Sequence, residues 1–448
     1  MTDTIYALAS ARGQSGVAVI RVSGEHALTS LQALSAGRDI PYRKAILCNL
    51  IRPVSRETLD HALVIAFQSP HSYTGEDVVE YHVHGGGAVV RDVLDALSTF
   101  DHHRMAEPGE FTRRAFENGK MDLTEAEAVA DLIHAETTLQ KQQALSQMGG
   151  ALGDIYDGWR DRLTRILAHV EAELEFPDED LEIDVLAQIS PQVEALRTEI
   201  REHLNDNRRG ERLRDGVRVA VIGAPNVGKS SLVNALVQRD VAIVSNMAGT
   251  TRDVIEAHLD IAGYPVILSD TAGLRPDQIG TAGQDSIESE GIRRALKVAQ
   301  EADIRVIVYD GTQEDLDTHS YDLETRDHAH TMAVINKADG ALKLQHPDNP
   351  LRISVTSQVG MTEFLAALAQ MIDVLVGGRA EAPSLTRQRH RDALNDCQES
   401  LERSLHAALP ELTAEDLRLA IRHVGRITGK VDVEDLLDVV FRDFCIGK

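Results

Sequence analysis

The feature that most constrains the fold is the segment Gly223-Ala-Pro-Asn-Val-Gly-Lys-Ser, which matches the phosphate-loop pattern G-x-x-x-x-G-K-[ST]. It follows a β-branched run, residues 217–222, and precedes an apolar stretch with helical spacing, which is the context that the pattern requires. Backbone N–H groups of such a loop and the N-terminus of its helix bind phosphates. We expect Lys229 to reach the β- and γ-phosphates of a nucleoside triphosphate and Ser230 to bind Mg²⁺.

Two further motifs would lie beside such a loop. Asp270-Thr-Ala-Gly follows a predicted strand at 265–269, which would place a carboxylate at the metal and the N–H of Gly273 near the γ-phosphate. The pair Thr250-Thr251 precedes that strand and supplies a switch threonine for Mg²⁺.

The fourth motif, Asn336-Lys-Ala-Asp, predicts which nucleotide base the site binds. It follows a predicted strand at 332–335, and the Asp339 carboxylate can accept hydrogen bonds from the ring N–H and the exocyclic amine of guanine. Adenine cannot supply that pair, and hydrogen bonds to a charged group are about twice as strong as neutral ones. Four motifs in this order and spacing predict a GTPase domain that resembles the translation-factor-related class.

The position that carries a catalytic glutamine in Ras-like enzymes is Leu274 here. A leucine cannot orient the attacking water, so the catalytic group must come from elsewhere or from a partner. Asp285, Glu288 and Glu290 are candidates, and the alternative is that they are solvated charges at the start of a helix. Asn226 in the phosphate loop either holds a monovalent cation beside the β–γ bridge or makes a local Asx hydrogen bond.

The remaining sequence predicts a multidomain fold of α/β and all-α parts. Three β-rich runs near the amino terminus predict strands at 16–22, 63–67 and 78–84. Helical patterns extend over 124–175, with a capping box at Thr124 and Glu127, over 191–204, and from Leu385 to the end. Between the helical parts, strands alternate with helices as in a doubly wound parallel sheet, with strand candidates at 217–222, 265–269, 305–309, 332–335 and 351–355. An α/β domain inserted into one helical domain accounts for this order.

Composition narrows the function classes. Lys and Arg number 46 and Asp and Glu number 71, giving a formal net charge of −25, which argues against a simple electrostatic clamp on nucleic acid. The three cysteines are too few and too scattered for a disulfide framework or a zinc cluster. Neither a secretory signal nor an apolar stretch near the ~20 residues that a bilayer needs is evident, so we expect a cytoplasmic protein with no membrane partner.

Segments from both ends of the chain resemble the MnmE (TrmE) family of tRNA modification GTPases. The matching segments are Asp3-Thr-Ile, Arg21-Val-Ser-Gly, Ser72-Tyr-Thr-Gly-Glu-Asp-Val, His84-Gly-Gly, the stretch Pro108–Leu123, Phe176-Pro-Asp-Glu-Asp, Arg389-His and Phe444-Cys-Ile-Gly-Lys. The resemblance implies an N-terminal α/β, tetrahydrofolate-binding-like dimerisation domain at 1–119. It also implies a helical domain at 120–212 and 380–448, with a Ras-like P-loop GTPase domain inserted at 213–379.

The resemblance also implies a function. The chain would be a K⁺-activated GTPase that forms a homodimer and joins the flavoprotein MnmG, which carries FAD, in a heterotetramer. Together they would add an aminomethyl or carboxymethylaminomethyl group to carbon five of the wobble uridine of certain tRNAs, which the partner largely contacts. The one-carbon unit would come from a 5-formyl- or 5,10-methylene-tetrahydrofolate. The alternative is a ribosome-assembly GTPase switch, for which a basic RNA-binding module or a second GTPase domain is expected.

Site residues carried over by the resemblance fall into four groups. The guanine nucleotide, with its Mg²⁺ on Ser230 and Thr251, would contact Asn226, Val227, Gly228, Lys229, Ser230, Ser231, Ser245, Asn246, Met247, Ala248, Gly249, Thr250, Thr251, Asp270, Thr271, Ala272, Gly273, Asn336, Lys337, Asp339, Ser354 and Val355. The K⁺ ligands would be Asn226, Ser245, Met247 and Thr250, the last three largely through carbonyls. The folate contacts would be Arg21, Glu80, Lys120 and Lys448. The catalytic set would be Glu288, Lys229, Thr251, Asp270 and Cys445.

Three features keep two interpretations each. Cys445 is either a catalytic thiol, which the resemblance favours, or a buried structural one. The strand face of Glu80, His82 and His84 is a polar ligand-pocket wall or a satisfied surface rather than a metal site, because no cysteine or carboxylate cluster nearby completes a ligand set. Arginines around 208–214 and 387–391 either touch tRNA or belong to solvated linkers.

Overall fold

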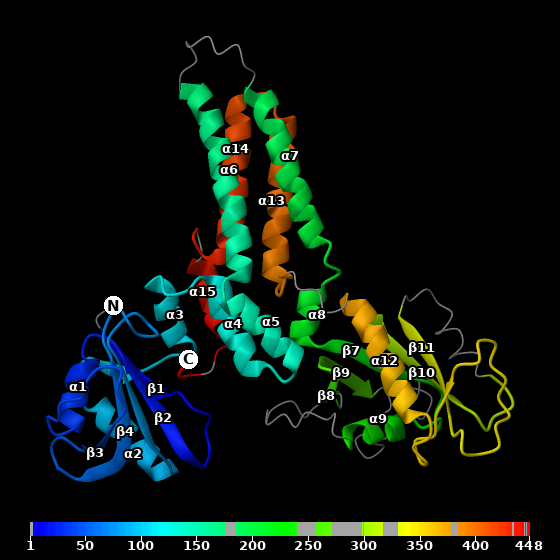
Figure 1. Cartoon of the computed structure of the whole chain (residues 1–448), viewed down its shortest axis with the longest axis horizontal. Coiled ribbons are helices and arrows are strands. Elements are labelled where there is room, and N and C mark those ends of the chain that lie inside the picture. Colours follow the sequence, from blue (N-terminus) through cyan, green and yellow to red (C-terminus); the bar gives the residue numbers. More distant parts are fainter. Residues whose placement is uncertain are drawn as a thin grey trace, which may run out of the picture. The chain divides into compact units, whose positions relative to one another are not determined.

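A six-stranded sheet forms the core of each of the two units into which the chain divides (Figure 1). The structure is a computed structural model, and it describes residues 3–175, 185–239, 256–270, 298, 300–316, 330–377, 383–431, 434–442, 444 and 446–448. The first unit comprises Met1–Ala130, Gln147–Leu181 and Ala407–Lys448, and the second comprises Asp131–Ser146 and Glu182–His406. All of the nucleotide-binding motifs fall within the second unit.

The sheet of the first unit has the strand order β3-β4-β5-β2-β1-β6, and only the β1–β6 pair is parallel. Its strands are β1 (Thr4–Leu8), β2 (Ser15–Ser23), β3 (Ile46–Ile51), β4 (Thr58–Phe67), β5 (Val78–Gly85) and β6 (His103–Met105). The three strands predicted from β-rich runs are confirmed as parts of β2, β4 and β5.

Side chains of β5 alternate between the two faces of this sheet. Val79, Tyr81 and Val83 are buried in the core, against which α1 (Ala27–Leu34) and α2 (Gly87–Ser98) pack. The intervening positions, Glu80, His82 and His84, lie on the other face, as the pattern predicted.

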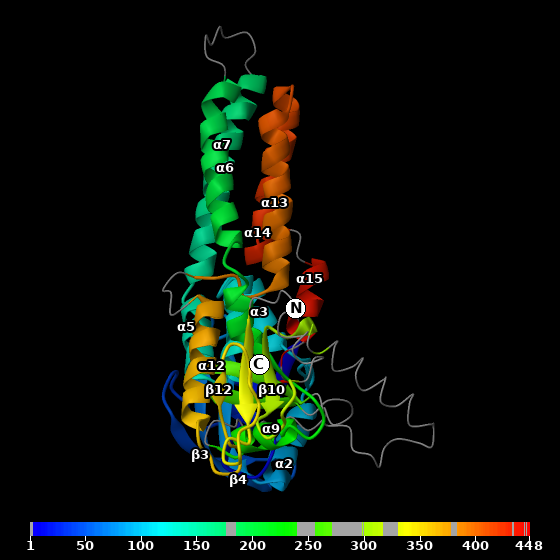
Figure 2. The same ribbon diagram turned by 90° about the vertical axis from the view of Figure 1, so that its right-hand side faces the viewer.

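The remaining helices of the first unit carry mostly apolar stripes. They are α3 (Glu110–Glu117), α4 (Leu123–His134, of which residues to Ala130 belong here), α6 (Ala151–Glu175), α14 (Pro410–Thr428) and α15 (Glu434–Arg442). The long helices α6 and α14 lie side by side in both views (Figures 1 and 2). Residues of α4 and α15 share a small core that includes Leu123, Leu437 and Phe441.

The predicted capping box at Thr124 and Glu127 is wrong by two residues. Helix α4 begins at Leu123, and the box is formed by Asp122 and Glu125. The Asp122 carboxylate accepts from the Glu125 backbone N–H at 2.8 Å, and the Glu125 carboxylate accepts from the Asp122 N–H at 2.7 Å. Aspartate is as good an N-cap as threonine, and the apolar run that begins at Leu123 sets the boundary.

The sheet of the second unit has the order β12-β11-β10-β7-β9-β8 and is parallel except for the edge strand β8. Its strands are β7 (Val217–Ile222), β8 (Glu256–Ile261), β9 (Tyr264–Asp270), β10 (Ile304–Asp310), β11 (Thr331–Asn336) and β12 (Leu351–Arg352). The five predicted strands are confirmed, although β12 is shorter than expected, and β8 was not predicted. Every residue of β10 is buried, as expected of a central parallel strand.

Helices complete the second unit. They are α5 (Thr138–Met148, of which residues to Ser146 belong here), α7 (Val185–Leu204), α8 (Arg209–Asp215), α9 (Lys229–Val237), α12 (Met361–Val376) and α13 (Gln388–His406). Helices α7 and α13 pack together, while the buried side chains of α9 and α12 join the core of the sheet. Among the residues that the structure describes, no helix is both long enough and apolar enough to cross a membrane.

Candidate functional site

The phosphate loop connects the end of β7 to the start of α9. Gly228 and Asn226 have positive φ angles of 103° and 65°. A Cβ on Gly228 would lie 2.2 Å from Nδ2 of Asn336, and one on Gly223 would lie 2.3 Å from the carbonyl oxygen of Val308, so both positions require glycine. The loop geometry therefore depends on close approach of the β10 and β11 ends.

Lys229 is held over this loop by backbone oxygens. Its Nζ donates to the carbonyls of Gly223 at 2.9 Å and Ala224 at 2.8 Å. Ser230 follows on the first turn of α9 and is exposed, as is Asn226, so their side-chain oxygens are accessible to cations. Oxygen ligands of this kind suit hard cations such as Mg²⁺.

Asn336 joins the phosphate loop to the predicted base-binding segments. It is buried, its Nδ2 donates to the carbonyl of Val227 at 2.8 Å, and its Oδ1 accepts from the N–H of Val355 at 3.3 Å. The hydroxyl of buried Ser354 hydrogen-bonds to the carboxylate of Asp339 and lowers its pKa, so that the carboxylate stays ionised at neutral pH. The structure thus brings together predicted residues from the loop, from 336–339 and from 354–355.

Lys337 also has a partner that the sequence did not identify. Its Nζ lies 2.6 Å from Oδ2 of Asp310, the last residue of β10. Burial raises the pKa of Asp310, but hydrogen bonds from Lys337 and Thr312 outweigh it, so the pKa of Asp310 is lowered overall. A strand-terminal aspartate preceding a glycine is the signal that sequence reasoning missed.

Several predicted site residues lie outside the described part of the chain. They are Ser245, Asn246, Met247, Ala248, Gly249, Thr250, Thr251, Thr271, Ala272, Gly273, Glu288 and Cys445. Asp270 is described only through its backbone, which ends β9 beside Val221 of β7. Ser230 of the predicted Mg²⁺ set and Asn226 of the predicted K⁺ set are therefore the ligands that the structure describes in full.

A second candidate site lies on the polar face of the first unit's sheet. Arg21 on β2 and Glu80 on β5 are register partners, and Nε and Nη2 of Arg21 donate to Oε1 of Glu80 at 3.0 and 2.9 Å. The guanidinium lies 5.1 Å from the ring centre of Tyr73 and 5.6 Å from that of Phe111. A charged pair beside two aromatic rings suits a flat, polar ligand such as a pterin.

The other two predicted folate residues border the same region by different routes. Nζ of Lys120 donates to the carbonyl of Pro70 at 3.0 Å, at the start of the loop that carries Tyr73. Lys448 ends a segment whose Gly447 is packed against the Leu8 backbone of β1. The sequence analysis missed the contribution of Tyr73 and Phe111, because nothing in local spacing shows that they flank Arg21.

Buried charges support the loop that presents Tyr73. Arg114, only 2% exposed, donates to Glu76 at 3.1 Å and to Glu110 at 3.0 Å. The hydroxyl of Ser23 also donates to Glu76, at 2.6 Å. The buried guanidinium of Arg114 thus links Glu76 to Glu110, and removing it would cost both carboxylates a partner, so the loop is held firmly.

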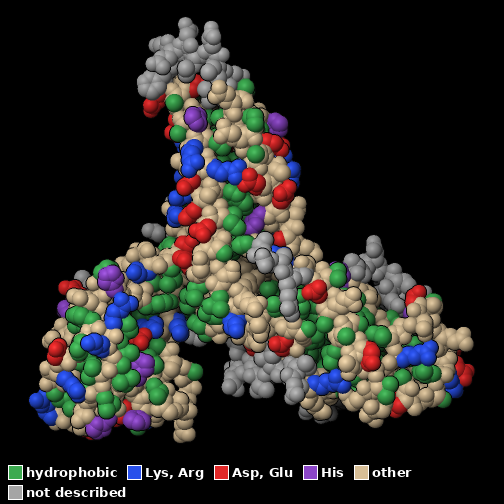
Figure 3. Space-filling model, in the orientation of Figure 1, with side chains coloured by type: hydrophobic (Ala, Val, Ile, Leu, Met, Phe, Trp, Pro, Cys, Tyr) green, Lys and Arg blue, Asp and Glu red, His purple; other side chains and the backbone are tan. Residues whose placement is uncertain are grey.

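The arginines considered for tRNA contact make ion pairs within the second unit. Arg391 contacts Asp206 and Glu211 at 2.7 and 2.9 Å, and Arg212 contacts Asp303 at 2.8 Å. These ion pairs give the arginines a structural role, which neither interpretation from the sequence included. Figure 3 shows Lys and Arg side chains interspersed with Asp and Glu along the helices. Arg418 and Glu171, on two helices of the first unit, form one ion pair at 2.9 Å.

Comparison with known proteins gives matches over the whole chain. The family model described as "MnmE helical domain" matches residues 123–445, and the model described as "GTP-binding protein TrmE N-terminus" matches residues 4–120. Relatives named tRNA modification GTPase MnmE from Parvibaculum lavamentivorans and Paramagnetospirillum magneticum are 52% and 48% identical, with full coverage of this chain and of theirs. The G domain of T. maritima FeoB is 27% identical over 36% of this chain and 98% of its own, with a TM-score of 0.25, too low to support an argument.

Proposed function

Because the chain belongs to the MnmE family of tRNA modification GTPases and is a GTP-hydrolysing enzyme, we propose that its GTP hydrolysis drives modification of tRNA wobble uridines. With the flavoprotein MnmG, it would add an aminomethyl or carboxymethylaminomethyl group at carbon five. The tRNA step rests on the similarity to the MnmE relatives. The structural observation that supports the GTP step is the pair of hydrogen bonds of Asn336, which hold the base-binding segments against the phosphate loop.

In the proposed hydrolysis, each residue of the nucleotide site has a separate role. Lys229 neutralises the β- and γ-phosphates, and Ser230, Thr251 and Asp270 bind or support Mg²⁺, which polarises the γ-phosphate when bound. Glu288 orients the attacking water in place of the glutamine that this chain lacks. The site selects guanine nucleotides because the Asp339 carboxylate accepts two hydrogen bonds, and only guanine supplies both donors.

Potassium would act at the same loop. Asn226 would supply an amide oxygen and Ser245, Met247 and Thr250 would supply carbonyls, a set of neutral oxygens that suits a large monovalent cation. The positive φ angle and exposure of Asn226 are consistent with a side chain that faces the phosphates rather than the core. Charge from a cation there would stabilise the transition state as an arginine does in other GTPases.

A tetrahydrofolate derivative would occupy the polar face at Arg21 and Glu80. The Glu80 carboxylate can accept from the pterin amine and ring N–H, while Lys120 and Lys448 suit the glutamate tail of the folate. Tyr73 and Phe111 provide apolar walls beside Arg21. The first unit would also form the homodimer contact, and MnmG would supply the FAD and most of the tRNA surface. Cys445 would act as a catalytic thiol.

The proposal is tested by reconstituting the full chain with MnmG, tRNA, GTP, methylene-tetrahydrofolate and ammonium or glycine, which supplies the nitrogen of the added group, followed by nucleoside mass spectrometry. Modified wobble uridine is expected only when GTP and the folate are both present. Product that forms without GTP would remove the proposed coupling. If the chain instead bound ribosomal subunits in a GTP-dependent manner and produced no modified uridine, the assembly-switch alternative would hold.

A further inference from the structure

Helix α5 contacts the starts of two strands whose opposite ends carry the nucleotide site. Strand β7 runs from Val217 to the phosphate loop, and β9 runs parallel to it from Tyr264 to Asp270. Nucleotides bind at the carboxyl ends of such strands, so α5 lies at the end of the sheet away from the nucleotide. Its first residues belong to the second unit, and the chain leaves that unit within this helix, between Ser146 and Gln147.

Gln140 connects α5 to the chain that enters β7. Its Oε1 accepts from the backbone N–H groups of Glu136 and Thr137 at 2.9 and 3.0 Å, which satisfies donors at the start of the helix. Its Nε2 donates to the carbonyl of Arg214 at 2.9 Å, three residues before β7 begins. One side chain therefore fixes both the helix start and the entry to the phosphate-loop strand.

The start of α5 and the residues just before it also hold the hairpin formed by β8 and β9. Leu139 packs against the core of the sheet and lies 3.5 Å from the Cβ position of Gly263, in the hairpin turn. Oε2 of Glu136 lies 3.2 Å from Nδ1 of His258 on β8. This hairpin joins the two segments that carry Thr251 and Asp270, so its position bears on both.

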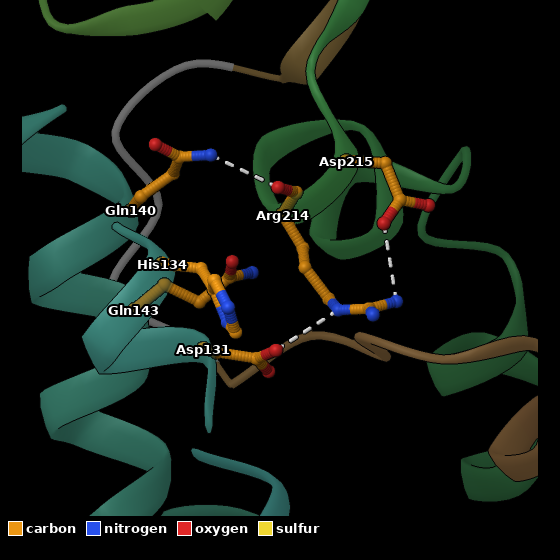
Figure 4. Close-up of a pocket in the computed structure, with 6 residues that line it drawn as sticks. All are labelled: Asp131, His134, Gln140, Gln143, Arg214 and Asp215. Atoms are coloured by element: carbon orange, nitrogen blue, oxygen red, sulfur yellow. Dashed lines mark hydrogen bonds and ion pairs between the residues drawn. The ribbon is translucent and has the colours of Figure 1, made fainter. Parts of the chain in front are cut away.

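A polar cavity of about 150 Å³ lies between α5 and α8 (Figure 4). Figure 4 shows Gln140 reaching across it to the Arg214 backbone, while Nε of Arg214 is 3.0 Å from Asp131. Gln143 lines the cavity and donates to the carbonyl of Gly210 at 3.2 Å. A junction made of a few hydrogen bonds around a polar space can shift at lower cost than a close-packed apolar core.

We propose that Gln140 is a positioning residue for GTP hydrolysis, acting through the strands that it links. By tying the start of α5 to the entry of β7, while Leu139 and Glu136 hold the β8–β9 hairpin, it sets the position of Asp270 relative to the phosphate loop. A shift of β9 along β7 on GTP hydrolysis would in turn displace α5. The proposal rests on the GTPase activity alone and is independent of the folate and of MnmG.

Gln140→Met in the full chain removes all three side-chain hydrogen bonds with little change in side-chain volume. We expect kcat for GTP to fall about fivefold, equivalent to ~1 kcal/mol in the barrier, with the dissociation constant for GDP within about twofold of wild type. Gln140→Glu keeps the helix cap but loses the donor to Arg214, so it isolates the strand contact and is expected to give the same fall. Gln142→Met, on the exposed face of the same helix, is the matched control.

Hydrogen exchange provides a readout that a purely structural role would not change. In the wild type, exchange of the amides of 136–143 is expected to differ between the GDP complex and a complex with a non-hydrolysable GTP analogue. In Gln140→Glu this difference should disappear while the variant still binds GDP. Two results would overturn the proposal. One is that both Gln140 variants turn over GTP as fast as Gln142→Met, and the other is that amide exchange in α5 is the same with either nucleotide.

Discussion

The ammonium of Lys337 lies 2.6 Å from the carboxylate of Asp310, across the ends of two neighbouring parallel strands. Lys337 follows Asn336, the asparagine that contacts the phosphate loop, so the ion pair anchors the guanine-binding motif directly beside that contact. Asp310 in turn is fixed by the N–H and hydroxyl of Thr312 at 3.0 and 2.7 Å. The base-binding segment is therefore held from β10 as well as from the loop.

Asp310→Asn is expected to weaken GDP binding by about fivefold, because the variant keeps the shape but loses the charge that orients Lys337. The effect is modest since Lys337 is 40% exposed and water screens the pair. Titration with a fluorescent GDP measures it, with exposed Asp315→Asn as the matched control. Equal affinities for the two variants would show that Lys337 needs no anchor.

The same pair predicts how the stability of the folded protein responds to pH. Because the pKa of Asp310 is lowered in the folded protein, the stabilisation is complete above the ordinary aspartate pKa of about 4 and is lost as the pH falls through the lowered value. The unfolding free energy of Asp310→Asn should therefore differ from that of the wild type at neutral pH and converge with it in acid. Denaturant titrations at several pH values test this, and a difference that grew in acid would contradict it.

Asp339→Asn is expected to reduce GTP affinity by about a hundredfold, since an amide cannot accept both guanine donors and places its own N–H₂ against one of them. The same variant should gain affinity for xanthosine triphosphate, whose C2 oxygen can accept from that amide. Competition binding with both nucleotides decides the matter. Unchanged guanine preference would mean that Asp339 does not contact the base.

Potassium dependence tests the proposed cation at Asn226. GTP turnover should be much faster in KCl than in NaCl at equal ionic strength, and Asn226→Gly should remove the difference. Glycine is the sharper substitution than alanine, because it accepts the φ angle of 65° without strain while deleting the amide. Equal wild-type rates in both salts would rule out the cation.

Glu288→Ala should abolish turnover with GTP binding nearly intact.

Glu80→Gln tests the folate site in the full chain. The amide keeps the size of the side chain but weakens the acceptor for a pterin, so binding of a tetrahydrofolate should weaken about tenfold. Equilibrium dialysis or calorimetry measures this, with His84→Gln on the exposed end of the same strand as control. If both variants bind like the wild type, the ligand lies elsewhere.

Strands and motifs were predictable where local pattern determines them. All of β10, and β7 from Val219 to Ile222, are buried because both faces of a parallel sheet are covered, so these strands were found from sequence. Strand β8 was missed because it is a short antiparallel edge whose charged residues weaken the pattern. The capping box was misplaced because Asp122 and Thr124 are both good caps two residues apart.

Tertiary partners could not be predicted in the same way. Asp310 and Lys337 are 27 residues apart, and Arg387 and Asp131, a further ion pair of the second unit, are 256 residues apart. Such pairs depend on which strands become neighbours, and one sequence without an alignment does not contain that information. For the same reason Gln140 showed no sign of a role until its contact with Arg214 was known.

Mass spectrometry of tRNA nucleosides from cells lacking this protein tests whether its GTP hydrolysis drives the modification of wobble uridines. We expect loss of aminomethyl-type uridines at the wobble position, restored by the wild-type chain but not by Asp339→Asn. An unchanged nucleoside profile in the deletion strain, or full restoration by the variant, would contradict the claim that GTP hydrolysis by this chain drives the modification.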